Sequence, residues 1–446
     1  MSAARPLESR LPDVLEELSG PRTPAYFDDI LSQVGHTRQR PGWSFPERWL
    51  PMTAISERVA TAPRIPMRLA VGLALLLLAL AVSVVLIAGS QRPSVPAPFG
   101  VAANGEVVFV DESGSITAGN IDDGTTRTIV RGPGNSGPVF SPDGQSLAYI
   151  HRAEAGRTEI VVSGPHGESP RVVNTTAVGD IGHLIWTPDS KSVMALVGAD
   201  LLAFDVGTPG EPRVLFTIPE GAPEGWLDNL NANVADAFRP PDGDEILFVG
   251  SGPDGTGLYR QKLTGGGPIA VVTDATTDST WQSNQSGAQW SPDGSQIVLT
   301  IHPAATPDFG YAYIVNADGT GLRRVSGFEA PGGGGIVDEE HAAWSPDGTR
   351  IAFGRWITYP DGSTDARPVV IVDIATGEER EASNREVNGY HSWSWSPDGT
   401  SILQVPGEGS DHSGSVIEVD ATTGEARQVG WTSSGAASWQ RTVPKP

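Results

Sequence analysis

The densest group of chemically active side chains is a run of three carboxyl residues and an imidazole, Asp338 to His341. His341 stands three residues before a tryptophan, and His183 holds the same position in an earlier part of the chain. Convergent carboxylates and imidazoles can bind a cation. The alternative is that these are solvated loop residues, or histidines that bond neighbouring backbone. The candidate ligand-binding residues are His183, Asp338, Glu340, His341, Tyr390 and His391. They are expected on loops that lead into inner strands and surround one mouth of a central channel, a concave position where ligands commonly bind.

A short repeated pattern sets the elements that must position these residues. It occurs six times after residue 100, and its aspartates are spaced by 46, 53, 51, 54 and 51 residues. The copies are Phe140–Gly144, Trp186–Ser190, Pro240–Gly243, Trp290–Gly294, Trp344–Gly348 and Trp395–Gly399.

The chemistry of the pattern predicts a tight turn between two strands. Proline presets φ, aspartate bonds its own backbone, and glycine accepts the left-handed position that closes a bulged hairpin. The aromatic residue ends the strand before the turn, where its ring can fill the wedge between neighbouring sheets. A second hairpin follows in each repeat, as in Ile371–Glu378. Two hairpins in about 50 residues make a four-stranded propeller blade.

The two ends of this region supply complementary halves of one more blade. Gly105–Asp111 is a strand without an aromatic inner strand, and Ala437–Trp439 is an inner strand without a turn after it. Pairing them closes the ring and removes exposed edges. The sequence therefore predicts an all-β, seven-bladed propeller closed by the C-terminal strand. An open ring of six blades would leave residues 105–130 without a place.

The W-S-P-D-G-x-x-I-A-F pattern, clearest at Trp344–Phe353, resembles the WD40-like repeat called PD40. That repeat belongs to TolB-type propellers and to the propellers of prolyl oligopeptidase and dipeptidyl peptidase IV relatives. The resemblance covers about residues 100–441 and implies a fold rather than an activity. Asp189-Ser190 and Arg239–Pro241 depart from the pattern, in the third and fourth blades.

Several kinds of chemistry are excluded or disfavoured. The chain has no cysteine, which rules out disulfides, thiolate metal sites and cysteine nucleophiles. The peptidase relatives carry a hydrolase domain with G-x-S-x-G, and no such motif occurs here. Gly250–Gly255 matches G-x-G-x-x-G, but a strand rather than a helix is expected to follow it. An enzyme is therefore not expected, and no metal or cofactor is assigned.

One segment is expected to cross a membrane. Leu69 to Gly89 contains 21 residues without a charge, long enough as a helix to span a hydrocarbon core of about 30 Å. Arg58, Arg64 and Arg68 precede it and only Arg92 follows closely, which places the N-terminus in the cytoplasm. The predicted parts are a largely disordered cytoplasmic segment with short helices (1–66), a transmembrane helix (67–90), a linker (91–100) and an extracytoplasmic propeller (101–441).

Charge is divided unevenly along the chain. Residues from 69 onward include 21 basic and 45 acidic residues, a net of −24. Nucleic acid is disfavoured as a partner, because phosphates need a positive field. The cytoplasmic segment instead mixes arginine with aromatic residues between Arg38 and Pro51, which suits a membrane interface or a partner groove.

Three functions are compatible with these features. The leading hypothesis is a membrane-anchored, extracytoplasmic binding or scaffold module for a protein or ligand. The second is a transmembrane signalling protein whose cytoplasmic segment holds a regulator; that segment resembles N-terminal segments of other bacterial membrane-anchored proteins, some of them anti-sigma-like. The third is a propeller enzyme that acts on an exported polymer such as a glycan.

Overall fold

The computed structural model describes residues 96–443 except 154–155, 177–180, 182–183, 198–199, 209, 218–237, 281–286, 332–333, 384–390, 407–413 and 436. The chain divides into two compact units, residues 1–92 and residues 93–446. The predicted transmembrane helix and cytoplasmic segment lie outside the described residues. Within the described part, no helix has the length and apolar character needed to cross a membrane.

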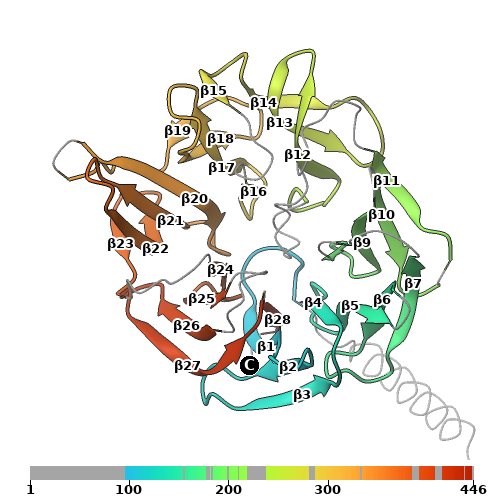
Figure 1. Cartoon of the computed structure of the whole chain (residues 1–446). Coiled ribbons are helices and arrows are strands. Elements are labelled where there is room, and N and C mark those ends of the chain that lie inside the picture. Colours follow the sequence, from blue (N-terminus) through green and yellow to red (C-terminus); the bar gives the residue numbers. More distant parts are fainter. Residues whose placement is uncertain are drawn as a thin grey trace, which may run out of the picture. The chain divides into compact units, whose positions relative to one another are not determined.

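Seven antiparallel sheets are arranged in a ring in the second unit (Figure 1). We number them as blades 1 to 7. Blade 1 has the order β28 (Ser438–Thr442), β1 (Ala103–Val110), β2 (Ile116–Gly119), β3 (Thr126–Val130). Blade 2 comprises β4 (Asn135–Phe140), β5 (Leu147–Ala153), β6 (Arg157–Ser163) and β7 (Arg171–Thr176). Blade 3 comprises β8 (Ile185–Trp186), β9 (Ser192–Val197), β10 (Asp200–Asp205) and β11 (Arg213–Thr217).

The remaining blades follow the same antiparallel order, with local variations. Blade 4 comprises β12 (Glu245–Gly252), β13 (Gly255–Lys262) and β14 (Ile269–Thr273). Blade 5 comprises β16 (Ala288–Trp290), β17 (Gln296–Pro303), β18 (Tyr311–Asn316) and β19 (Arg323–Arg324), and β15 (Ser279–Thr280) also pairs with β17. Blade 6 comprises β20 (Ile336–Trp344), β21 (Arg350–Thr358), β22 (Thr364–Asp373) and β23 (Glu379–Glu381). Blade 7 comprises β24 (His391–Trp395), β25 (Ser401–Pro406), β26 (Gly414–Asp420) and β27 (Ala426–Ser433).

The ring is closed by the last strand, as the two ends of the repeat region predicted. β28 pairs antiparallel with β1, with Trp439 opposite Val107 and Thr442 opposite Ala103. The C-terminal strand is thus the innermost strand of a blade whose other strands come from the start of the region. The seven-bladed, all-β prediction is confirmed.

The repeated turn is built by a serine and the aspartate two residues later. In blade 6, Ser345 Oγ donates to Asp347 Oδ1 at 2.5 Å and accepts the backbone N–H of Arg350 at 3.0 Å. The same two bonds occur at Ser141, Ser291 and Ser396. Each turn therefore satisfies its own polar groups while it reverses the chain between the first two strands of a blade.

The two blades with an irregular pattern keep their register by local adjustments. Ser190 replaces the glycine of the turn in blade 3 and takes a φ of 58°, the left-handed position that glycine occupies elsewhere. In blade 4 the turn carries an extra proline. The aromatic position, three residues before the aspartate in other blades, would fall on Arg239, and Phe238 takes it instead. Phe238 is buried and forms an isolated bridge with Ile246 of β12.

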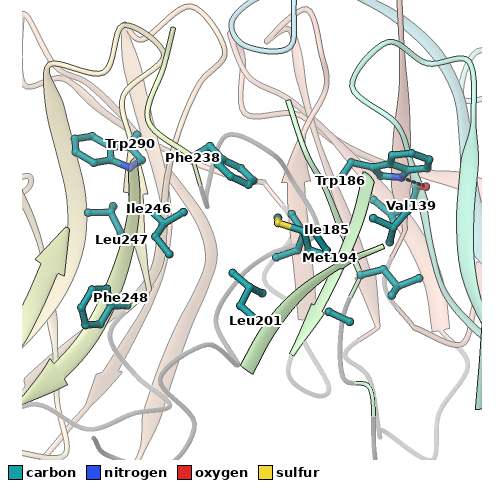
Figure 2. Packing of buried hydrophobic residues seen from close by; sticks show 14 of the residues in the cluster. Val139, Ile185, Trp186, Met194, Leu201, Phe238, Ile246, Leu247, Phe248 and Trp290 are labelled. Atoms are coloured by element: carbon teal, nitrogen blue, oxygen red, sulfur yellow. Dashed lines mark hydrogen bonds between the residues drawn. The ribbon is translucent and has the colours of Figure 1, made fainter. Parts of the chain in front are cut away.

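The hydrophobic core lies in the wedges between blades. Figure 2 shows this packing, with the rings of Trp186, Phe238 and Trp290 among the side chains it labels. The indole N–H of Trp186 also donates to the carbonyl of Val139 in the preceding blade, at 3.1 Å. The motif aromatics therefore join neighbouring blades, which accounts for their place at the end of each first strand.

Candidate functional site

The carboxyl-rich run predicted in a loop lies instead within a strand. β20 begins at Ile336 and continues to Trp344, and it pairs with β21 from Ile336 opposite Thr358 to Trp344 opposite Ile351. The neighbouring strand β21 is long enough to pair with the whole run. The first strand of blade 6 therefore begins earlier in the sequence than expected, at Ile336. The acidic residues consequently alternate between the two faces of a sheet.

Asp338 and Glu340 lie on the same face of β20, and their side chains share a hydrogen bond. Asp338 Oδ1 also accepts the backbone N–H of Gly310, at 2.7 Å, in the preceding blade. The carbonyl of the same glycine accepts the N–H of Glu339 at 2.9 Å. Gly310 therefore fixes both the strand and the first carboxyl group of the pair.

The surroundings of Gly310 leave no room for a side chain. A Cβ at this position would lie 2.5 Å from Thr300 Cγ2 and 2.9 Å from the imidazole of His302. His302 is fully buried, and its positive charge, when present, opposes the rise in the pKa of Asp338. Gly310 and the imidazole of His302, both in blade 5, thus lie next to the carboxyl pair.

The pair holds a proton at neutral pH. Burial, and secondarily the charge of Glu340, raise the pKa of Asp338 to about 7. Burial also raises the pKa of Glu340, while the hydrogen bond from Asp338 opposes that rise. Two carboxyl groups in contact cannot both ionise at low cost, so one shared proton is the expected state near pH 7.

His341 extends the pair toward solvent. Its Nε2 lies 4.0 Å from Glu340 Oε2, and 51% of its side chain is exposed. Its φ of 57° lies in the left-handed region, where the pairing of β20 with β21 shifts between Glu340 and Ala343. Dense surrounding protein lowers the pKa of His341, and the charge of Asp338 opposes this change.

Glu339 points to the other face of β20 and joins a buried network of charges. Its Oε1 accepts from Arg355 Nη2 at 3.0 Å, and neither side chain has any exposed surface. Arg355 Nη1 also contacts Glu379 at 2.8 Å. Burial raises the pKa of Glu339, but Arg355 and Arg324 oppose this rise. This network joins three strands of blade 6 to β18 and β19 of blade 5, and its role is structural.

Three of the six predicted residues are therefore brought together. Asp338, Glu340 and His341 form one cluster at the first strand of blade 6. His183 and Tyr390 lie outside the described residues. His391 begins β24, where its backbone pairs with Pro406, but its side chain lies outside the described part.

The sequence reasoning did not identify His302, Gly310 or Arg355. For Arg355 a signal was present, because an arginine inside the apolar run Ile351–Ile357 requires a buried carboxylate partner. His302 and Gly310 are brought to Asp338 by packing between blades, which no local pattern in the sequence records.

The cluster lacks the arrangement of a metal site. Among the described residues, no three histidine, aspartate or glutamate side chains are grouped so that they could hold a metal ion. Asp338 and Glu340 also have no arginine or lysine as an ion-pair partner within the described part of the chain. The arrangement can donate or accept a proton, and it can bind a positively charged group that replaces that proton.

Comparisons with known proteins find similarity in structure but not in sequence. No protein-family model matches the chain, and no curated protein matches it. TolB from Acinetobacter baumannii is 18% identical with a TM-score of 0.43, over 77% of this chain and 81% of that one. An oligogalacturonate lyase in complex with manganese is 16% identical with a TM-score of 0.49, over 75% of this chain and 86% of that one. The periplasmic gluconolactonase PpgL of Pseudomonas aeruginosa is 17% identical with a TM-score of 0.47, over 76% of this chain and 99% of that one. At these values the comparisons assign no function to the chain.

Proposed function

We propose that this protein is a membrane-anchored, extracytoplasmic β-propeller that binds a partner carrying a positively charged group. The observation behind this proposal is the Asp338–Glu340 pair, which is largely buried, shares a hydrogen bond, and has no arginine or lysine of the described residues bound to it. A lysine or arginine side chain of a partner supplies the missing charge. The half-exposed His341 marks the side from which such a group approaches.

Electrostatics supports a cationic partner over an anionic one. The part of the chain from residue 69 onward carries a net charge of −24. Such a field attracts positively charged molecules and repels nucleic acid and acidic polymers. The field provides attraction over the whole surface, and the carboxyl pair provides a specific position for one charged group.

The proposal predicts binding that strengthens as pH rises. A cation replaces the proton of the pair, so the affinity falls where the proton is held. With a pKa of about 7 for Asp338, the dissociation constant should be about thirtyfold larger at pH 5.5 than at pH 8.

The experiment uses the full-length protein in detergent, with tetralysine and its fully Nζ-acetylated form as probes at constant ionic strength. Tetralysine should bind with the stated pH dependence, and the acetylated peptide should not bind. The double variant Asp338→Asn, Glu340→Gln should bind at least tenfold more weakly. Glu112→Gln removes an exposed carboxylate and is the matched control. An equal loss in Glu112→Gln, or a flat pH profile, would show that only the diffuse charge acts.

The membrane anchor is a separate part of the proposal and rests on the 21 uncharged residues Leu69 to Gly89. A protease added outside intact cells should cut the propeller and leave residues 1–66 protected. Replacement of Leu76 and Leu77 by arginine should release the chain from the membrane fraction, because each charge at the centre of a bilayer costs about 2.5–3.5 kcal/mol. Protection of the propeller would place it in the cytoplasm and reject this orientation.

A second candidate function is acid–base catalysis on an exported polymer. It is favoured by the pKa of about 7 at Asp338, since a group that titrates near the working pH transfers protons efficiently. Release of sugar from envelope glycan should then show a bell-shaped pH profile in the wild type and be lost in Asp338→Asn. Unchanged release in that variant would remove the pair from catalysis.

A further inference from the structure

The strand next to the carboxyl pair carries a tryptophan on the same face of the sheet. Strands β20 and β21 lie side by side in blade 6 (Figure 1), and their register places Asp338 opposite Trp356. Residues directly opposite in an antiparallel pair point to the same side, with Cβ atoms about 4.5–5.5 Å apart. The next pair shows this geometry on the other face, where Glu339 lies opposite Arg355 and the two side chains are 3.0 Å apart. The indole of Trp356 therefore lies beside the carboxyl group of Asp338.

This part of the face can be reached from solvent. Trp356 is partly exposed, and its neighbour on the outer strand β22 is the small residue Ala366. Glu340 lies opposite Gly354, which has no side chain, and 20% of the Glu340 side chain is exposed. A ligand can therefore contact a carboxyl group and the indole from the same side of the sheet.

A carboxyl pair beside an indole favours a guanidinium group over an ammonium group. An aromatic ring attracts a cation that lies within about 6 Å of its centroid, and tryptophan does so most strongly. A guanidinium group is planar and weakly hydrated, stacks on aromatic rings, and donates parallel hydrogen bonds to carboxyl oxygens. An ammonium group is compact and strongly hydrated, so it loses more hydration when it approaches a ring.

The opposite face of β20 already combines carboxylate, arginine and aromatic ring within the protein. Arg355 contacts Glu339 at 3.0 Å, and its guanidinium carbon lies 4.1 Å from the centre of the Phe328 ring. Arg324 lies 3.8 Å from the same carboxylate and 4.0 Å from the centre of the Tyr311 ring. The face with the carboxyl pair has the acidic groups and the aromatic ring, but no arginine of the described residues is bound to the pair.

We propose that Asp338, Glu340 and Trp356 bind the guanidinium group of an arginine side chain from a partner protein. This inference rests on the proposed function and names the cation that the site selects. Once the shared proton has left, the two carboxyl groups accept hydrogen bonds from the guanidinium N–H groups, and the indole stacks on its planar face. Trp356 is thus the residue that distinguishes arginine from lysine.

The first measurement compares tetraarginine with tetralysine, which carry the same side-chain charge, on the full-length protein in detergent at constant ionic strength. Tetraarginine should bind about fivefold more tightly, the size expected for one cation–π contact at a partly exposed site. Equal affinities, or tighter binding of tetralysine, would overturn this inference and leave the proposed cation site standing. Binding of neither peptide would overturn the proposed function, and this inference with it.

A tryptophan variant separates the ring contact from general charge attraction. In Trp356→Leu, tetraarginine binding should weaken about fivefold and tetralysine binding should change less than about twofold. Trp393→Leu is the matched control, because Trp393 is also partly exposed but lies opposite the uncharged Gln404. An unchanged preference for arginine in Trp356→Leu, or an equal loss in Trp393→Leu, would overturn the assignment. The comparison of the two peptides on the wild type remains decisive if Trp356→Leu does not fold.

Discussion

The two faces of strand β20 place carboxyl groups in opposite situations. On one face, Glu339 is fully buried but contacts Arg355 at 3.0 Å. On the other face, Asp338 and Glu340 contact each other and have no arginine or lysine partner in the described structure. Adjacent residues of one strand thus serve different purposes: the paired carboxylate joins blades, and the unpaired carboxyl groups remain available for a proton or a ligand.

The largest effect should come from removing the cation on the paired face. Arg355→Met leaves the buried Glu339 with only the more distant Arg324, at 3.8 Å, as a counter-charge and should lower the free energy of unfolding by about 3–5 kcal/mol. The methionine still packs against Phe328 and Phe353, whose rings lie 4.1 and 5.2 Å from the guanidinium carbon. Denaturant unfolding of the full-length protein measures the change.

Two controls separate charge from packing in this experiment. Adding Glu339→Gln to Arg355→Met removes the uncompensated charge and should restore more than half of the lost stability. Arg127→Met breaks an exposed ion pair with Glu106 and should cost less than about 1 kcal/mol. If Arg355→Met costs no more than Arg127→Met, the buried network does not join the blades.

The next effect concerns Gly310, whose backbone binds both the Asp338 side chain and the Glu339 N–H. Gly310→Ala brings a methyl group to 2.5 Å from Thr300 Cγ2 and 2.9 Å from the His302 ring. Overpacking of this kind should cost about 1–3 kcal/mol. It should also move the N–H that binds Asp338, and so weaken tetralysine binding as well as stability. Gly267→Ala, where no atom lies within 4 Å of the added Cβ, is the control and should leave both unchanged.

The carboxyl group of Asp338, which has no arginine or lysine partner among the described residues, should make the stability of the protein depend on pH. The pKa of Asp338 is raised from 3.8 to about 7 on folding. Between these values the folded protein holds a proton that the unfolded chain has released, so the wild type loses stability as pH rises from about 4 to about 7. Asp338→Asn stays neutral and escapes this loss. Its Tm relative to wild type should therefore increase with pH and level off above pH 7.

A series of Tm measurements from pH 4 to pH 8 tests this sign. Glu112→Gln, at an exposed position, should follow the wild type throughout. An Asp338→Asn curve that runs parallel to the wild type would mean that the carboxyl group does not retain its proton on folding.

The fold was predictable because its information is local and repeated. Each turn needs its own proline, aspartate and glycine, and each aromatic residue marks the end of a first strand. The pairing of β28 with β1 followed from two incomplete ends. The same reasoning placed Asp338 and His341 in a loop, because it treated the segment that leads into the motif tryptophan Trp344 as a long connection before a short inner strand. The long partner strand β21 was the missing information.

The site was predictable only where its residues are neighbours in the sequence. Asp338, Glu340 and His341 were found because they lie within one run. His302 and Gly310 come from the preceding blade, and their approach to Asp338 depends on how two sheets pack. Likewise, nothing local in the sequence distinguishes the indole of Trp186, which donates to Val139, from that of Trp344, which has no hydrogen-bond partner among the described residues.

The smallest expected effect concerns the bend at His341, which separates the carboxyl pair from the motif tryptophan. A residue with a side chain costs about 1–2 kcal/mol at such a left-handed position, and the φ of His341 is 57°. His341→Gly relieves this strain but adds freedom to the unfolded chain, which offsets about half of the gain. Stability should therefore rise by less than about 1 kcal/mol, while His341→Ala should leave it unchanged or slightly lower. If His341→Gly is destabilised by more than about 1 kcal/mol, the imidazole stabilises the fold through its contact with Glu340. The face of β20 that carries Asp338 and Glu340 would then have a structural role, as the face with Glu339 does.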